Sequence, residues 1–437
     1  MEERENFTSK LGFIMACLGS AIGLGNIWMF PWKLGQYGGA AFLIPYFIFV
    51  YLLGVTGLIG EFSFGRWTKG GSFEGIQRVF KDKKLPGGKI VSLVPALAVG
   101  GTLVFYAVVV GWTFKYFCES VKGSFYSVNI EEFFNSFTGS NLSIFWAFIA
   151  ILVTLLIVNM GVIKGIEKLN KIMMPALFVI FIILLIRSLT LPGAMKGVEY
   201  LLKPKWHYLL KPVTWIMALG QAFFTVSLNG AGMVVYGSYL KDTEDIPKAS
   251  MQIAIFDTLS ALLAAFVIIP AVFAFGLNPS AGPSLLFITM PYVFKSMPLG
   301  YVFGILFFIS IIFAAVSSLI NMLEATSEAF LSQFKIGRFK GAAIISIIAF
   351  LIGIPLNLSM DAFGKWADFV TIYIAPLGTM LSTFTFFWIY GVDNALVEIN
   401  KGSKEPLGNW FKLLGKYAFV FSCILVIILG VIYNGIG

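Results

Sequence analysis

Apolar segments long enough to cross a lipid bilayer recur along this chain from end to end. A spanning helix needs about 20 apolar residues. Eleven segments of this kind lie near residues 11–34, 40–64, 90–118, 143–160, 170–187, 213–239, 250–275, 299–331, 341–358, 366–390 and 413–434. Only 12% of the 437 residues are charged, whereas about a quarter is usual in a soluble domain. The sequence therefore predicts an all-α membrane protein with eleven transmembrane helices in a single domain, 1–437.

Positive charges are unevenly placed, and their placement predicts how the chain is oriented. With a cytoplasmic N-terminus, 21 of the 31 Lys and Arg residues fall on the cytoplasmic side, seven of them between Arg66 and Lys89. Basic residues gather on that side of membrane proteins. We therefore expect an inner-membrane protein with a cytoplasmic N-terminus and, since eleven is odd, an external C-terminus. The net charge of +9 is then a topology signal, and we expect no nucleic-acid partner.

A run of small and polar residues, Gly19–Asn26, lies in the middle of the first apolar segment. Inside a bilayer no water satisfies free backbone groups, so irregular backbone is tolerated only against protein or a polar cavity. This run is therefore a candidate site for a solute and ions. An alternative is simple packing, because Gly19 and Gly23 form a small-xxx-small pair of the kind that lets helices approach closely.

A second interruption, Ser227–Gly232, lies in the sixth segment, five segments after the first. Because five is odd, two five-helix units would run in opposite directions through the membrane. We therefore expect inverted repeats at 11–187 and 213–390, followed by an eleventh helix at 413–434. Matching interruptions in two halves mark the binding site of secondary transporters, so the pair favours a transport site over helix packing.

Asp257 is an ionisable residue deep in the seventh segment, where a charge is costly. A carboxylate there would be protonated or paired with a cation. Sodium is a hard cation that prefers oxygen ligands, and Asn26, Thr225 and the carbonyl of Ala21 could supply them. Two alternatives remain: a protonated acid bonded to a neighbouring helix, and an acid that titrates and couples transport to protons.

Two adjacent serines in the eighth segment, Ser317 and Ser318, suggest a second oxygen-rich site. Backbone carbonyls freed near Gly19 and Ile22 could complete it. Serine hydroxyls in helices also bond back to their own backbone, and this alternative is equally open at this stage.

The other buried acids and the single histidine suggest structural roles. Glu61 could cap backbone N–H groups of a broken helix, and Glu324 lies further along the eighth segment than the two serines. His207 lies between Trp206 and Tyr208, an arrangement typical of a membrane interface. No Ser/His/Asp or HExxH arrangement is present in a plausible place, so we do not expect an enzyme.

Several of these stretches together resemble the neurotransmitter:sodium symporter family, in particular its bacterial amino-acid transporters. The resemblance covers essentially the whole chain. It is carried by Gly23–Pro31 (GLGNIWMFP), Gly38–Phe42 (GGAAF), Gln221–Leu228 (QAFFTVSL), the stretch 314–318 and Gly391–Asp393 (GVD). The resemblance implies a LeuT-type fold with broken first and sixth helices, and a sodium-coupled amino-acid symporter that works by alternating access.

The resemblance also implies ligand sets for two co-transported Na⁺ ions and a substrate. The first sodium would bind Ala21, Asn26, Thr225 and Asp257, together with the substrate carboxylate. The second sodium would bind Gly19, Ile22, Ala314, Ser317 and Ser318. The implied substrate site comprises Ala21, Gly23, Leu24, Gly25, Thr102, Tyr106, Phe224, Thr225, Ser227, Asn229, Gly230, Ser318 and Met322.

The chain departs from the family pattern at charged positions. Many members carry asparagine where this chain has Asp257, and chloride-dependent members need an anion close by, so we expect chloride-independent transport. The usual outer-gate arginine is replaced by Met29, and Lys33 is a candidate substitute that would reach Asp368. On the inner side Arg4 resembles the gate cation. Its usual acidic partner aligns with Ser332, which leaves Ser238 and Tyr239 to support the gate.

A further departure bears on the substrate. Gly230, next to Asn229, stands where a bulky aromatic residue often lines the side-chain pocket, so we expect room for an aromatic amino acid such as tyrosine. The alternatives are a proton-coupled carrier and a broad-specificity carrier of hydrophobic amino acids. A channel or a receptor is an alternative from another functional class, and the matching interruptions in the first and sixth segments argue against it.

Overall fold

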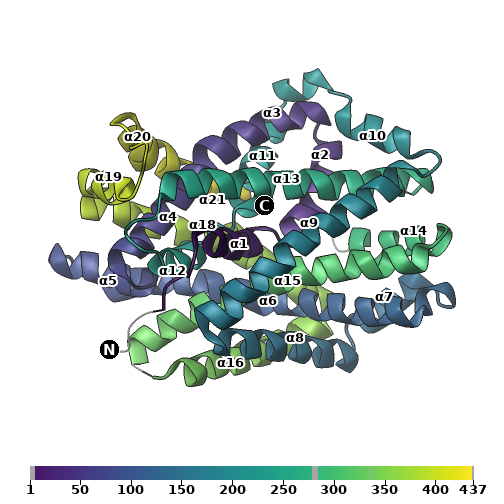
Figure 1. Cartoon of the computed structure of the whole chain (residues 1–437), viewed down its shortest axis with the longest axis horizontal. Coiled ribbons are helices and arrows are strands. Elements are labelled where there is room, and N and C mark those ends of the chain that lie inside the picture. The colour runs from purple at the N-terminus through teal and green to yellow at the C-terminus, as the bar shows by residue number, and fades with distance from the viewer. Residues whose placement is uncertain (1–4, 278–283, 335, 436–437) are drawn as a thin grey trace.

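The computed structural model describes residues 5–277, 284–334 and 336–435, and within them the chain is helical, with long helices that run roughly side by side (Figure 1). Nine of the described helices are long and apolar enough to cross a membrane. They are Ala40–Thr68 (α3–α4), Gly88–Lys122 (α6), Asn141–Asn159 (α8), Val162–Leu189 (ending in α9), Ile246–Ala274 (α13), Gly300–Phe334 (α15), Arg338–Leu358 (α16), Met360–Asn400 (α17–α19) and Trp410–Ile432 (α20–α21).

The first predicted span is broken. Its halves are α1 (Lys10–Ala21) and a second part, Gly25–Gln36, that ends in α2 (Phe30–Gln36), and they meet at 56°. At the break, Ile22 has an extended backbone, with φ −71° and ψ 103°. Pro31 lies in the first turn of α2, where its missing N–H is tolerated. The break therefore falls inside the predicted run Gly19–Asn26.

The sixth predicted span is broken as well, into α11 (Pro212–Thr225) and α12 (Gly232–Ser238). Between them Ser227 has a φ of 55° and Gly230 a φ of 78°, left-handed values that glycine adopts without strain. The side-chain oxygen of Asn229 accepts hydrogen bonds from Ala231 N (3.0 Å) and Gly232 N (2.7 Å). These bonds satisfy N–H groups that the start of α12 leaves without helical partners.

Seven of the described helical segments are single π-helical turns, a rare conformation that is frequent at functional sites. They are Gly25–Met29, Val50–Gly54, Val162–Glu167, Leu285–Thr289, Phe369–Ile374, Thr385–Gly391 and Leu414–Phe419. Two of them, Gly25–Met29 and Phe369–Ile374, contribute residues to the central cavity described below.

Glycines let several helices approach closely around the two breaks, against backbone or side-chain atoms of their neighbours. A Cβ atom on Gly65 of α4 would lie 1.9 Å from Val234 O of α12, and one on Gly237 of α12 would lie 2.4 Å from Phe62 O of α4. One on Gly19 would lie 1.9 Å from Asn170 Oδ1 on α9. The packing role weighed for Gly19 is therefore real, and it coexists with its position beside a candidate ion site.

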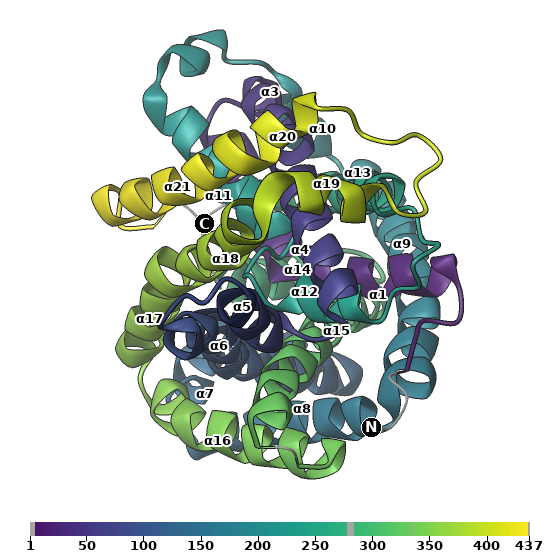
Figure 2. The same cartoon turned by 90° about the vertical axis from the view of Figure 1, so that its left-hand side faces the viewer.

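The short helices gather at the two ends of the bundle. One end carries α5 (Ser72–Asp82), α19 (Val392–Asn400) and the N-terminal segment, and we call it the α5 end; the opposite end carries α7 (Ile130–Phe137) and α10 (Ala194–Leu202) (Figure 1). Figure 2 views the molecule from the α5 end, with α20–α21 lying across the outside of α18 (Ala375–Phe384).

Candidate functional site

A central cavity lies where the two broken helices meet. It is lined by Ser20, Ala21, Gly23, Leu24, Gly25, Asn26, Thr102, Tyr106, Gly220, Phe223, Phe224, Ser227, Leu228, Asn229, Ser318, Met322, Thr371, Ile372, Ala375, Pro376, Val426 and Gly430. The two breaks are joined directly, because Ser227 Oγ donates a hydrogen bond to Ser20 O at 2.8 Å. Of the thirteen residues expected to bind substrate, all but Thr225 and Gly230 line this cavity.

Tyr106 on α6 closes one side of the cavity over the first break. Leu24 N donates a hydrogen bond to the Tyr106 hydroxyl at 3.1 Å. Gly23 has to be glycine here, since a Cβ atom would lie 2.7 Å from that hydroxyl. On the other side the Phe224 ring lies over Gly25, whose added Cβ atom would meet the ring at 2.7 Å. The break thus brings backbone N–H groups and the Tyr106 hydroxyl, which can itself donate a hydrogen bond, to one side of the cavity, a suitable place for an anionic group.

Gly230 does not open the space that the sequence suggested. It lies outside the lining of the cavity, and a Cβ atom there would be 2.2 Å from Gly378 O on α18. The backbone of α18 therefore occupies the volume expected for an aromatic substrate ring. The neighbouring Asn229 does line the cavity. Its side-chain oxygen is engaged by Ala231 N and Gly232 N, which leaves its amide nitrogen as the group that can donate to a ligand.

Three of the four residues expected for the first sodium, Asn26, Thr225 and Asp257, come together in the structure. Asp257 is fully buried, and its two carboxylate oxygens accept hydrogen bonds from Asn26 Nδ2 and Thr225 Oγ1, both at 2.8 Å. Asn26 Nδ2 also lies 3.2 Å from Ser260 Oγ, a hydroxyl that the sequence did not single out. A buried carboxylate with the hydroxyl oxygens of Thr225 and Ser260 close by offers oxygen ligands to a hard cation.

The residues expected for the second sodium also converge. Ser318 Oγ lies 3.2 Å from Gly19 O, 3.4 Å from Ile22 O and 3.0 Å from Ala314 O. Ser317 Oγ bonds back to its own helix, at 2.7 Å from Phe313 O and 3.0 Å from Ala314 O. The back-bonding considered for these serines therefore occurs, and the carbonyls of the break still face Ser318.

Glu61 on α4 makes the contact expected of it with the second break. Its Oε1 atom accepts a hydrogen bond from Gly230 N at 2.9 Å, and its side chain is fully buried. The carboxylate satisfies a backbone group that the interruption of the sixth span would otherwise leave without a partner.

The expected gate residues are only partly brought together. Lys33 is buried whereas Asp368 is exposed, and no ion pair joins them in the described part of the chain. The expected outer pair is therefore not formed in this structure, because the side chain of Lys33 is turned into the protein. Arg4 lies outside the described residues. Tyr239 donates a hydrogen bond to Glu324 Oε1 at 2.5 Å.

Glu324, which we had interpreted as structural, is the centre of a polar cluster near the α5 end. Besides Tyr239 it binds Arg338, whose Nη2 atom lies 2.8 Å from both carboxylate oxygens. Arg338 also donates to Val158 O at 3.3 Å. The sequence signal was available: a buried acid on the eighth span, followed fourteen residues later by a basic residue just before the ninth predicted span.

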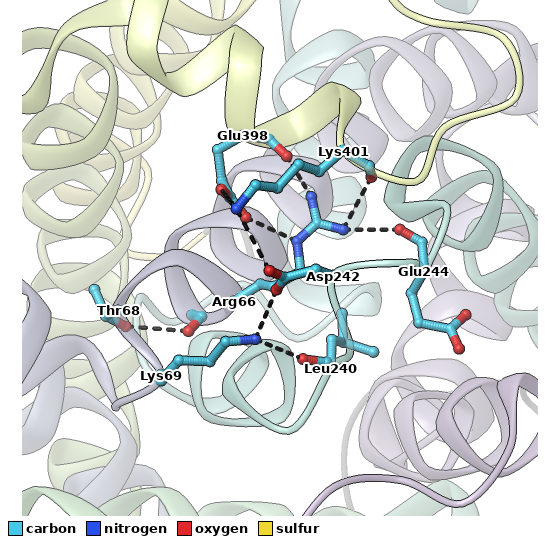
Figure 3. A network of polar contacts seen from close by, with 9 residues as sticks. Arg66, Thr68, Lys69, Leu240, Asp242, Glu244, Glu398 and Lys401 are labelled. Carbon is cyan, nitrogen blue, oxygen red and sulfur yellow. Dashed lines mark hydrogen bonds and ion pairs between the residues drawn. The ribbon is translucent and has the colours of Figure 1, made fainter.

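A second polar network at the α5 end was missed by the sequence reasoning (Figure 3). Arg66, 1% exposed, pairs with Glu398 at 2.8 Å and donates to Glu244 O at 2.8 Å and Lys401 O at 3.1 Å. Lys69 donates to Asp242 at 2.9 Å, and this hydrogen bond lowers the pKa of Asp242 below its usual range. The network ties the end of α4 to the loop after α12 and to the end of α19.

Comparison with known proteins identifies the family. The sequence matches the sequence model of the Sodium:neurotransmitter symporter family over residues 4–136 and 124–435. The chain belongs to this family. The sodium-dependent transporter YhdH of Bacillus subtilis is 37% identical over 428 residues, which cover 93% of this chain and 94% of that protein. The sodium-dependent serotonin transporter of Drosophila melanogaster is 25% identical over 92% of this chain and 73% of its own length.

A solved structure agrees with this family. The crystal structure of MhsT in complex with L-phenylalanine matches with a TM-score of 0.87 and 35% sequence identity, over 98% of this chain and 99% of that chain. The predictions of an all-α membrane transporter of the LeuT type, and of a protein that is not an enzyme, are thereby confirmed. As a sodium:neurotransmitter symporter, the chain is a sodium-coupled transporter, which removes the channel and receptor alternatives.

Proposed function

We propose that this symporter takes up aromatic and large hydrophobic L-amino acids together with two sodium ions, without a requirement for chloride. The observation that carries the proposal is the central cavity, where polar backbone from two breaks faces apolar side chains such as Met322, Phe223 and Ile372. The likeness to MhsT, solved with L-phenylalanine, supports an amino acid of this size.

The polar end of the substrate would lie on the first break. Its carboxylate would accept hydrogen bonds from backbone N–H groups near Gly25 and from Tyr106, while its amino group would bind carbonyls near Ala21 and Phe224. A broken helix offers N–H groups to anions and carbonyls to cations, so a zwitterion matches both. The apolar wall and the amide nitrogen of Asn229 would receive the side chain.

The two sodium ions would join elements that move relative to one another. The first, at Asp257, Asn26 and Thr225, links the seventh span to both breaks. The second, at Ser318 and the carbonyls of Gly19 and Ile22, links the eighth span to the first. Each ion can shift the conformational equilibrium only through its different affinity for the two states. If all the ligands of a sodium ion come together only in the closed or outward-facing state, binding of sodium favours that state and couples sodium binding to substrate transport.

The buried charge of Asp257 supports independence from chloride. Two sodium ions and a zwitterionic amino acid together carry two positive charges. A fixed carboxylate beside the first ion neutralises one of them without a dissolved anion, which would otherwise have to lose its hydration. The α5 end, with its basic loops, would face the cytoplasm.

Uptake of labelled phenylalanine into proteoliposomes tests the proposal. An inward sodium gradient should drive uptake, replacement of chloride by gluconate should leave it unchanged, and unlabelled tyrosine should compete better than alanine. The gradients of sodium and protons are set independently. Uptake driven by a proton gradient in sodium-free buffer would favour the proton-coupled alternative, and equal competition by all amino acids would favour the broad-specificity carrier.

A further inference from the structure

An apolar groove on the outside of the bundle, near the α5 end, is separate from the central cavity. Its lining residues come from α18, the turn Thr385–Gly391 and the segment from α20 to α21, helices that lie next to one another in Figure 2, and its volume is about 800 Å³. Phe384 from one wall and Phe421 and Ile424 from the other are among its lining residues, and each is at least 38% exposed. Apart from Lys416, the lining is apolar or aromatic. Surface of this composition at membrane depth suits hydrocarbon chains.

At one end of the groove the positive charge of Lys416 lies close to two aromatic rings. Lys416 Nζ lies 4.6 Å from the centre of the Trp388 ring and 5.4 Å from that of Tyr417. Trp388 Nε1 donates to Lys416 O at 2.7 Å, which joins the two walls. Trp, Tyr and Lys together are typical of the level where lipid headgroups lie.

The charge of Lys416 is not neutralised within the described residues. Asp393, an acidic residue close enough to interact with Lys416, is paired instead with Lys412 at 2.6 Å. No ion pair to Lys416 is formed in the part of the chain that the structure describes. Lys416 is also the single charged residue among those that line the groove, so this end of the groove attracts anions.

The backbone of both walls is irregular at the same level. Trp388 lies in the π-helical turn Thr385–Gly391, and Lys416 and Tyr417 lie in the turn Leu414–Phe419. Such turns are rare in helices and are concentrated at functional sites. The central cavity, which contains two further π turns, shows the same association in this chain.

We propose that this groove binds an anionic phospholipid, with its phosphate on Lys416 and an acyl chain along Phe384, Phe421 and Ile424. The positive charge of Lys416 complements the anionic lipids of the cytoplasmic leaflet. An acyl chain in the groove would cover the exposed aromatic side chains that line it. A lysine acts here as a point charge on a phosphate. The site is independent of the substrate proposed for the central cavity.

Native mass spectrometry of the full-length protein in detergent tests this site with two lipids that share acyl chains, phosphatidylglycerol and phosphatidylcholine. Phosphatidylglycerol should bind more tightly. Lys416→Gln should weaken it about fivefold and leave phosphatidylcholine unchanged, while Lys416→Arg should retain it. Lys404→Gln is the matched control, a nearby exposed cation outside the groove, and should behave as wild type.

A variant that fills the groove and a soluble headgroup distinguish the contribution of the acyl chain to binding from that of the headgroup. Ala418→Trp should weaken both lipids, and soluble glycerophosphoglycerol should not displace bound phosphatidylglycerol. Equal binding of the two lipids, or a Lys416→Gln variant that behaves as wild type, would overturn the proposal. So would displacement by the soluble headgroup, which would indicate a phosphate site without a lipid chain, or a dimer that Ala418→Trp dissociates, which would indicate a second copy of the chain.

Discussion

At the scale of single residues, the central site depends on backbone groups that are exposed only because two helices are interrupted. The sequence identified most of the side chains around them, since glycine runs and buried polar residues are visible in one dimension. It could not show that Gly230 lies against the backbone of α18, because that approach depends on how distant helices pack. For the same reason the sequence could suggest an ion pair between Lys33 and Asp368 that the structure does not contain.

Replacing Tyr106 by Phe should weaken substrate binding while leaving the fold intact. The change removes the hydroxyl that Leu24 N contacts and that we expect to donate to the substrate carboxylate. A hydrogen bond to a charged group contributes about 1.5–3 kcal/mol, so the affinity should fall roughly 10- to 100-fold. Sodium-dependent binding of labelled phenylalanine measures it. Thr113→Val, a similar loss of a hydroxyl on α6 away from the cavity, should have little effect.

Replacing Asp257 by Asn should make transport depend on chloride. The amide keeps an oxygen for sodium but removes the fixed negative charge that offsets one of the two sodium charges. We expect uptake by Asp257→Asn to fall when gluconate replaces chloride, whereas wild-type uptake does not change. Initial rates in proteoliposomes provide the comparison. A variant that is equally active with and without chloride would show that Asp257 does not serve as the fixed anion.

At the scale of elements, the broken helices were predictable and their contacts were not. Glycine, asparagine and proline at the breaks are local signals that act on their own backbone. Gly65 and Gly237 are required for a different reason, because only a residue without a side chain lets the backbones of α4 and α12 come into contact there. In the sequence they resemble any other glycine in an apolar helix.

The contact between α4 and α12 predicts a strong effect of a very small substitution. Gly65→Ala places a methyl group 1.9 Å from Val234 O, so the helices must separate. Overpacking of this kind costs about 1–3 kcal/mol, and the thermal unfolding midpoint in detergent should fall. Gly364→Ala is the matched control, a helical glycine with nothing within 4 Å of the added carbon. An equal midpoint for the two variants would contradict the contact.

At the scale of the whole molecule, two polar clusters hold the α5 end together. One joins Tyr239, Glu324 and Arg338, and the other joins Arg66, Glu398 and Asp242 (Figure 3). Their members come from segments far apart in the sequence, so composition and spacing could predict a basic face but not its pairings. Arg66 was counted only as one charge among seven in a cytoplasmic loop.

Arg338→Gln should open the α5 end more often, because Glu324 loses the guanidinium that holds it. Cys17 on α1 is fully buried and serves as a reporter in a Cys118→Ser, Cys423→Ala background. Its labelling by a maleimide should become severalfold faster, and saturating sodium should slow it again. Arg187→Gln changes an arginine that contacts Pro298 O outside this cluster, and should not alter the rate. Unchanged labelling in Arg338→Gln would argue against a closing role for the cluster.

The π-helical turns bear on how this family can change over time. Each such turn holds one residue more than an α-helical path between the same two points, so its span carries a single surplus position. Loss of one residue from Val50–Gly54 could be absorbed where it occurs, with the helix on either side keeping its facing. Elsewhere in a span, the same loss would rotate every following side chain by about 100°. Six of these seven turns, all but Leu285–Thr289, lie in spans, and there a relative can differ in length by one residue without a change in the helix on either side. A comparison that forces equal lengths through them would misplace the residues beyond.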